Sequence, residues 1–394
     1  MSMDSNDAHR AGWTPSDEDF EDLEPEPGPR PAIDLEDLCR PLTDPCWGEA
    51  GWLNERPGPR PMLLDAVEGK GSKPFLPLGK VALLAAAGGA GKTQALAQLA
   101  LTVASASHAP GDRRLWLGAY RPALDGPGNV LWACAEEDRD ELRRRLQRAA
   151  RGIGLNDREQ DRAGRHLWPL PLYGEDSRLV TPELEDSRFL VELERYLAAD
   201  DRKWALVILD PGSMFMGADD EKDNAAATAF VKRVQQMTQA PGGPTVIVAM
   251  HTGKQGVRND VADDDQYLVR GSSAFVDGAR WVASIRWLDG VIKGPGLPRM
   301  LCMQHTKTNY TPKAPPLNLV MDEEGFVRSA TDEDWKKLNE ATIAATIAAA
   351  ALIASKKKAE AEAKKKAEAE AKKKAEAEAR AKGKLSFADM ERGR

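Results

Sequence analysis

Short apolar runs alternate with longer stretches of mixed apolar and charged residues from about residue 61 onward. This rhythm is typical of a parallel β-sheet whose strands are joined by crossover helices. Four apolar runs are predicted to be strands: VALLAAA (81–87), NVLWACA (129–135), WALVILD (204–210) and TVIVAM (245–250). Each is followed by Gly, acidic or His residues. Because ligands of open parallel sheets bind beyond the carboxyl ends of the strands, these polar residues are the first candidates for function.

The C-terminal part of the chain has a different pattern, with no helix-breaking residue between TDED (331–334) and about Lys382. Thr followed by three acids predicts a helix start there, because acidic side chains stabilise a helix N-terminus. The octad KKKAEAEA then occurs three times in succession from residue 356, which places each Glu four residues from a Lys. Such i,i+4 pairs are worth about 0.2–0.5 kcal/mol each.

We expect the octads to form a single solvated helix that acts as a spacer of roughly 36 Å, at 1.5 Å per residue. An arm that touches nucleic acid is the alternative, because residues 356–384 carry twelve basic and six acidic side chains. The closing LSFADMERGR holds an apolar cluster and is interpreted either as a docking peptide or as a frayed tail.

Charge is distributed unevenly along the chain. Residues 1–50 carry fourteen Asp or Glu against three Arg, are rich in proline and contain few aliphatic residues, which predicts disorder. The four cysteines show no metal-ligand spacing, and the acidic N-terminus is not a signal peptide, so a reduced, cytoplasmic setting is expected. The longest apolar run, residues 341–354, falls short of the ~20 residues that span a bilayer, so no membrane protein is expected.

A phosphate-binding loop is predicted where the strand at 81–87 meets the helix that follows it. The pattern G-x-x-x-x-G-K-[ST] would start at position 86, where this chain has Ala86. Paired glycines shortly afterwards supply the unusual dihedrals and turn backbone amides toward phosphate oxygens. Lys92 would reach the β and γ phosphates of ATP, and the Thr93 hydroxyl would bind Mg²⁺. The predicted ATP-binding residues are Gly88, Gly89, Ala90, Gly91, Lys92 and Thr93.

Carboxylates end two other predicted strands. Asp210 closes LVILD and is a candidate Mg²⁺ ligand opposite the loop. Glu136, Glu137 and Asp138 end NVLWACAEED, and Glu136, the first to leave the strand, is the candidate that activates water for hydrolysis. The alternative is that these acids only open the charged helix that follows.

In this order, the motifs LLAAAGGAGKT, VLWACAEED with DELRRRL, LVILD, VIVAMHTGK, VRGSSAFVDGARW and HTKTNY closely resemble hexameric replicative helicases of the plasmid RepA type. The resemblance covers about residues 61–320 and implies a RecA-like core. The loop glycine absent at Ala86 is often replaced in such relatives too.

The resemblance implies roles for individual residues. Glu136 matches the water-activating glutamate, Asp210 the Mg²⁺ aspartate, and His251 a polar sensor near the γ-phosphate. Relatives often carry two histidines at the last position, where this chain has Met250 and His251. Arg280 matches an arginine finger that acts in trans on a neighbour's ATP, with Lys307 and Arg270 as other candidates.

A polar segment at 254–269 lies between the last predicted strand and RGSS, and its length suits a mobile loop that faces the channel of a ring. Lys254 and Arg258 could follow a phosphate backbone there, with Arg270 at its end. Three consecutive aspartates at 263–265 argue against a simple basic patch. DNA binding is therefore implied mainly by the resemblance.

The expected fold class is α/β: a RecA-like P-loop core with a mostly parallel sheet flanked by helices. The expected parts are an acidic, mostly disordered arm (1–60), the ATPase core (61–330), the charged helix (331–384) and a tail peptide (385–394). The arm or the tail is a candidate contact for a protein partner.

The leading hypothesis is an Mg²⁺- and ATP-dependent helicase that forms a homo-oligomer, a hexamer by analogy. It would translocate on single-stranded DNA in the replication of a plasmid, phage or mobile element. A RecA-like recombination or repair ATPase on single strands is the second hypothesis. A scaffold whose assembly is controlled by nucleotide is the third.

Overall fold

The computed structural model describes residues 39–69, 71–107, 114–199, 202–216, 223–252 and 272–391. In the last helix, side chains are described through residue 375 and at residues 377 and 378. Residues 1–38, which make up most of the predicted acidic arm (1–60), lie outside the described residues. Lys254, Arg258 and Arg270 lie outside them too. Residues 39–60 form a largely exposed segment with one short 3₁₀ helix, η2 (Pro45–Trp47).

The described core is built on a nine-stranded sheet with the order β12-β11-β10-β9-β3-β8-β7-β5-β6. From β9 to β6 the neighbours run parallel, and the other three strands extend the sheet in antiparallel fashion. The parallel strands are β3 (Val81–Ala86), β5 (Asn129–Cys134), β6 (Leu167–Pro171), β7 (Trp204–Asp210), β8 (Thr245–His251) and β9 (Trp281–Trp287). The antiparallel ones are β10 (Arg299–Thr308), β11 (Leu317–Met321) and β12 (Val327–Ser329). All four predicted strands are present.

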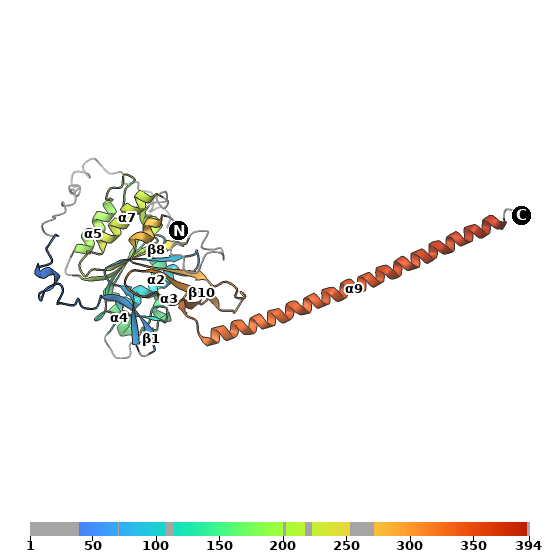
Figure 1. Ribbon diagram of the computed structural model, residues 1–394, viewed down its shortest axis with the longest axis horizontal. Coiled ribbons are helices and arrows are strands. Elements are labelled where there is room, and N and C mark those ends of the chain that lie inside the picture. Colours follow the sequence, from blue (N-terminus) through green and yellow to red (C-terminus); the bar gives the residue numbers. More distant parts are fainter. Residues whose placement is uncertain are drawn as a thin grey trace, which may run out of the picture.

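Helices cover both faces of this sheet (Figure 1), and the buried apolar residues form one cluster on each face. One face is covered by α2 (Lys92–Ala104), α3 (Arg139–Gly152) and α4 (Asp157–His166). The other is covered by α5 (Arg188–Ala198), α6 (Gly212–Met216), α7 (Asn224–Met237) and α8 (Ser273–Gly278). The predicted fold class, an α/β core with a mostly parallel sheet flanked by helices, is confirmed.

A small antiparallel sheet lies beside the core, with the order β2-β1-β4. It consists of β1 (Met62–Glu68), β2 (Gly71–Pro77) and β4 (Tyr120–Pro122). Phe75 joins it to the main sheet, because its ring stacks on Tyr120 at 3.9 Å and meets the edge of Trp281 at 5.3 Å.

The last helix, α9 (Asp332–Glu391), projects from the core as a single rod (Figure 1). Its start is fixed by Asp334, which accepts from the amide and hydroxyl of Thr331 and forms an ion pair with Arg328 at 2.7 Å. The helix begins where TDED predicted and runs on through Glu391, beyond the expected end near Lys382.

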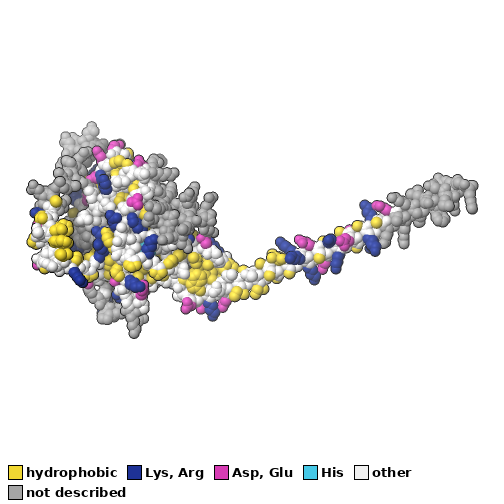
Figure 2. Space-filling model, in the orientation of Figure 1, with side chains coloured by type: hydrophobic (Ala, Val, Ile, Leu, Met, Phe, Trp, Pro, Cys, Tyr) yellow, Lys and Arg dark blue, Asp and Glu magenta, His cyan; other side chains and the backbone are white. Residues whose placement is uncertain are grey.

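Charged side chains alternate along the octads, whereas apolar ones cover the stretch of α9 nearest the core (Figure 2). Among the described octad side chains, the expected i,i+4 pairs are not formed within 4.0 Å. Within the described residues, the part of α9 from Asp332 to Ala375 is long and apolar enough to cross a membrane by length and composition only. Its most apolar window is 6% buried, and one such helix is weak evidence for a membrane span.

Candidate nucleotide site

The predicted phosphate loop connects β3 to α2 at the carboxyl edge of the sheet. Gly89 and Gly91 have left-handed backbones, with φ of 73° and 78°, which only glycine adopts readily. A Cβ added at Gly88 or Gly89 would meet no atom within 4 Å, so the loop backbone is open on its outer side. Ala90 is buried beneath the loop. The loop leads directly into the N-terminus of α2, where the first amides of a helix have no partner within the helix, and this is the geometry that binds phosphate.

Two charged groups lie buried next to this loop without hydrogen bonds. Lys92 is 7% exposed and Asp210, at the end of β7, is 1% exposed; Lys92 Nζ lies 3.9 Å from Asp210 Oδ1. Neither Lys92 Nζ nor either Asp210 oxygen has a hydrogen-bond partner within the described residues. Burial raises the pKa of Asp210, and the charge of Lys92 and the Thr93 side chain lower it in part. Buried charged groups normally make hydrogen bonds as well as ion pairs, so the unused capacity of this pair fits a phosphate for Lys92 and a divalent cation for Asp210.

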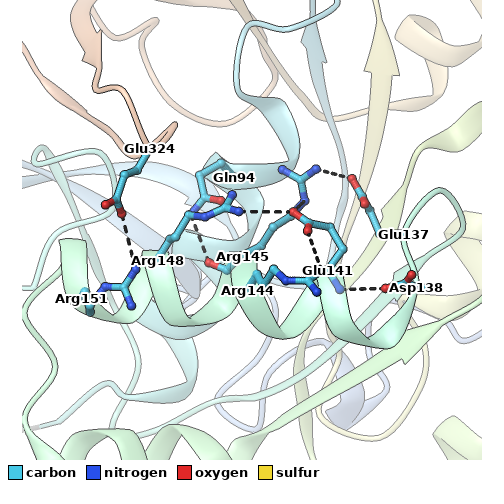
Figure 3. Close-up of polar contacts among 9 residues, drawn as sticks. All are labelled: Gln94, Glu137, Asp138, Glu141, Arg144, Arg145, Arg148, Arg151 and Glu324. Atoms are coloured by element: carbon cyan, nitrogen blue, oxygen red, sulfur yellow. Dashed lines mark hydrogen bonds and ion pairs between the residues drawn. The ribbon is translucent and has the colours of Figure 1, made fainter.

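Three consecutive acids after β5 have different environments, and Figure 3 shows two of them, Glu137 and Asp138. Asp138 is the N-cap of α3, since its side chain accepts from the amide of Glu141 at 2.8 Å. Glu137 forms an ion pair with Arg145. Glu136 is exposed on the cavity beside the loop and makes no hydrogen bond or ion pair with a described residue. The helix-start interpretation therefore applies to Asp138, and Glu136 remains available for chemistry.

Helix α3 brings arginines to the same cavity (Figure 3). Arg145 and Arg148 line it, and Glu141 lies 3.7 Å from Arg145 Nε and 3.6 Å from Arg148 Nη2. Gln94 of α2 donates to the carbonyl oxygen of Arg145 at 3.2 Å, which ties α3 to the first turn of α2. Sequence reasoning missed both arginines, although Arg145 belongs to DELRRRL (140–146) and Arg148 comes two residues after it.

The turn between β11 and β12 forms the outer wall of the cavity, which has a volume of about 400 Å³. Glu324 in this turn forms an ion pair with Arg151 at 3.5 Å, and Arg299 donates to the carbonyl oxygen of Asp322. Sequence reasoning missed this wall too, since nothing in the local pattern indicates that the turn returns to the loop. The residues lining the cavity are Ala87, Gly88, Gly89, Gly91, Lys92, Thr93, Gln94, Glu136, Glu137, Arg145, Arg148, His251, Arg299, Met321, Glu323, Glu324 and Gly325.

His251 lies at the end of β8, in register with Ala86 at the end of β3, and lines the same cavity. The structure thus gathers the predicted phosphate loop, Glu136, Asp210 and His251 at one edge of the sheet. Its donor set is glycine amides, one lysine, one hydroxyl and carboxylates, which suits a nucleoside triphosphate with Mg²⁺.

Arg280 and Lys307 lie on the opposite side of the sheet from the phosphate loop, at the amino ends of the parallel strands. The amide of Arg280 donates to the carbonyl oxygen of Val81 at the start of β3, 2.9 Å away, whereas the phosphate loop follows the end of that strand. Lys307 Nζ donates to the carbonyl oxygen of Val276 at 2.6 Å, and burial lowers the pKa of its amine. Six strand residues separate the two edges by roughly 20 Å. Neither cation therefore reaches the cavity of its own chain.

Residues 49–257, more than half of the chain, match the protein-family model described as AAA domain. Two solved structures are similar at low sequence identity. The RadB recombinase is 14% identical with a TM-score of 0.41, over 64% of this chain and 92% of that one. A KaiC-like protein from Pyrococcus horikoshii OT3 is 14% identical with a TM-score of 0.41, over 65% of this chain and 91% of that one.

Proposed function

Because this chain belongs to the AAA domain family, we propose that it is an ATP-hydrolysing motor, a ring-forming DNA helicase of the RepA type. It would translocate on single-stranded DNA during replication of a plasmid, phage or mobile element. The observation that carries the ATPase part is the buried pair Lys92 and Asp210, whose charged atoms make no hydrogen bond within the described residues, beside an open glycine loop.

The predicted site residues have separate roles in this mechanism. The loop amides and Lys92 hold the β and γ phosphates of ATP, and Thr93 and Asp210 hold Mg²⁺, which supplies positive charge for the β and γ oxygens. Glu136, exposed and unpaired at the cavity, orients the attacking water and accepts its proton. His251, the last residue of β8, contacts the γ-phosphate, so that release of this phosphate changes the position of the end of β8.

The cations at the opposite edge support assembly. A phosphate loop at one edge and Arg280 with Lys307 at the other can meet only if copies associate head to tail. Such contacts do not close at two copies; they produce a ring or a filament. Arg280 of one copy would then stabilise the charge that builds on the γ-phosphate held by the next copy.

The DNA-binding part rests on the likeness of the motifs to RepA-type helicases. Lys254, Arg258 and Arg270 follow β8, so a loop from each copy would lie toward the axis of a ring and follow the DNA backbone. Binding through phosphates weakens as the salt concentration rises.

The test is strand displacement on a forked DNA duplex at low salt. We expect ATP-dependent unwinding and DNA-stimulated ATP turnover by the wild-type chain, and loss of both in Lys92→Ala. Turnover without unwinding at any salt concentration would contradict the helicase and favour the recombination or repair ATPase. Absence of ATP turnover in the wild-type chain would contradict both ATPase hypotheses and favour the scaffold whose assembly is controlled by nucleotide.

A mixing experiment tests the trans site. Lys92→Ala keeps Arg280 but has a defective loop, and Arg280→Ala has the reverse defect. When the two inactive variants are mixed, about a quarter of the interfaces pair a sound loop with a sound arginine, so turnover should return in part. No recovery on mixing, with each variant still assembled, would exclude Arg280 as a finger in trans.

A further inference from the structure

An apolar groove lies on the outer side of α3, away from the phosphate loop. It has a volume of about 530 Å³ and runs between α3, α4 and the edge strand β6. Leucines, alanines and prolines make up most of its wall, and Arg139 and Arg143 border it. We call it the α3–α4 groove. Its lining residues are Leu101, Arg139, Leu142, Arg143, Leu146, Gln147, Ala150, Leu155, Gln160, Ala163, Gly164, Leu167, Pro169 and Pro171.

The two bordering arginines differ from the other arginines of α3. Arg144, Arg145, Arg148 and Arg151 each form an ion pair with a glutamate. Arg139 and Arg143 are exposed and have no ion-pair partner among the described residues. The groove therefore offers apolar surface next to two uncompensated positive charges, which favours an occupant with apolar side chains and carboxylates.

The edge strand limits how an occupant can bind. The amide of Leu172 donates to the carbonyl oxygen of Cys134 in β5, so by alternation the backbone groups of residues 167, 169 and 171 point outward. Two of these positions are Pro169 and Pro171, which have no amide hydrogen. An added strand would lack those donors, so the occupant must bind through its side chains.

The chain itself contains a segment of the required chemistry. Residues 16–26, SDEDFEDLEPE, hold seven acids around Phe20 and Leu23. In a helical turn, side chains three residues apart share a face, so these two could enter the groove together. The fifteen residues that connect residue 24 to residue 39 span up to about 50 Å. This compares with a radius of gyration of about 19 Å for a compact core of some 300 residues.

We propose that the α3–α4 groove binds residues 17–24 of the same chain, with Phe20 and Leu23 on the apolar wall and the flanking acids near Arg139 and Arg143. The opposite face of α3 carries Arg145 and Arg148 into the nucleotide cavity. A segment bound in the groove would therefore contact the same helix, α3, that contributes Arg145 and Arg148 to the nucleotide cavity.

The test uses the full chain with a benzophenone amino acid in place of Phe20. On illumination we expect cross-links to map by mass spectrometry to residues 139–171 in a product of monomer mass. The double variant Arg139→Glu and Arg143→Glu should lower the yield at least fivefold. Arg158→Glu is the matched control, because Arg158 is exposed on α4 but does not line the groove, and it should leave the yield unchanged.

Leu23→Asp provides a second variant outside the folded core, and it should lower the same yield. Cross-links that map elsewhere, that appear mainly at dimer mass, or that do not respond to these charge changes would contradict the proposal. If Arg139→Glu with Arg143→Glu instead weakens binding of a labelled single-stranded DNA and spares the cross-link, the arginines serve nucleic acid and the proposal is wrong.

Discussion

Three neighbouring acids in the stretch after β5 show how backbone geometry divides one sequence motif into separate roles. Asp138 is extended and caps α3, Glu137 turns toward Arg145, and Glu136 leaves the strand edge toward the phosphate loop. The residue types alone do not separate them. Their positions relative to the end of the strand and the start of the helix do.

Glu136→Gln should therefore lower ATP turnover at least 100-fold, because the amide cannot accept the proton of water, while ATP still binds. Turnover and equilibrium binding of a fluorescent ATP analogue measure the two effects separately. Asp138→Ala is the matched control two residues away. It should lower the free energy of unfolding by about 1 kcal/mol through loss of the cap and change turnover only a few-fold. Equal losses of turnover in both variants would contradict the role given to Glu136.

At this scale, sequence indicates the site residues that end a strand or follow the glycine loop. Asp210 and His251 end buried apolar runs and Lys92 follows the loop after β3, so their shared position at the carboxyl ends of the strands could be predicted. Arg145, Arg148 and Arg299 could not, because a helix face and the start of an antiparallel strand reach the cavity only through tertiary packing.

The β11–β12 hairpin is the element whose placement depends most on such packing. Phe326 lies directly against Gly152 at the end of α3, where an added Cβ would be 2.1 Å from the ring. With its amide oriented to match its neighbours, the buried Gln98 of α2 donates to the carbonyl oxygen of Val327 at 2.8 Å and accepts from its amide at 2.9 Å. These contacts hold the turn that carries Glu323 and Glu324 over the phosphate loop.

Gly152→Ala should displace Phe326 and with it the wall of the cavity, so that ATP binds about three- to tenfold more weakly, a loss of roughly 1 kcal/mol. Titration with a fluorescent ATP analogue measures this. Gly164→Ala is the control, because an added Cβ there meets nothing within 4 Å and alanine favours a helix. Unchanged ATP affinity in Gly152→Ala would show that the turn does not contribute to binding.

Among elements, the central parallel strands could be predicted because they are short and almost wholly apolar. The antiparallel extension could not, since β10 buries Gln304, His305 and Thr306 and so lacks a continuous apolar run. In the small sheet, β2 contains one proline in its middle and ends at another, and β4 has three residues, so neither shows a clear alternation of apolar and polar positions.

At the scale of the whole molecule, α9 projects from the core, and among the described residues the contacts between the two come from its first turns. Deletion of residues 364–371, one octad, should leave ATP turnover unchanged and shorten the rod by about 12 Å. The maximum dimension from small-angle X-ray scattering measures the length. Replacement of the same octad by Gly and Ser is the control, because it keeps the residue number but interrupts the helix. A loss of turnover on deletion would mean that the rod acts on the core.

The number of octads in α9 also determines the direction in which the segment after them points, measured around the helix axis. Eight residues at 100° each make two full turns and about 80° more, so every added or lost octad rotates whatever follows it by nearly a quarter turn about the helix axis. A change in the number of octads therefore aims the C-terminal end at a different side. The number of octads therefore sets the angle at which the C-terminal end leaves the rod as well as its length, and only after four or five octads does that angle return to within about 40° of its starting value.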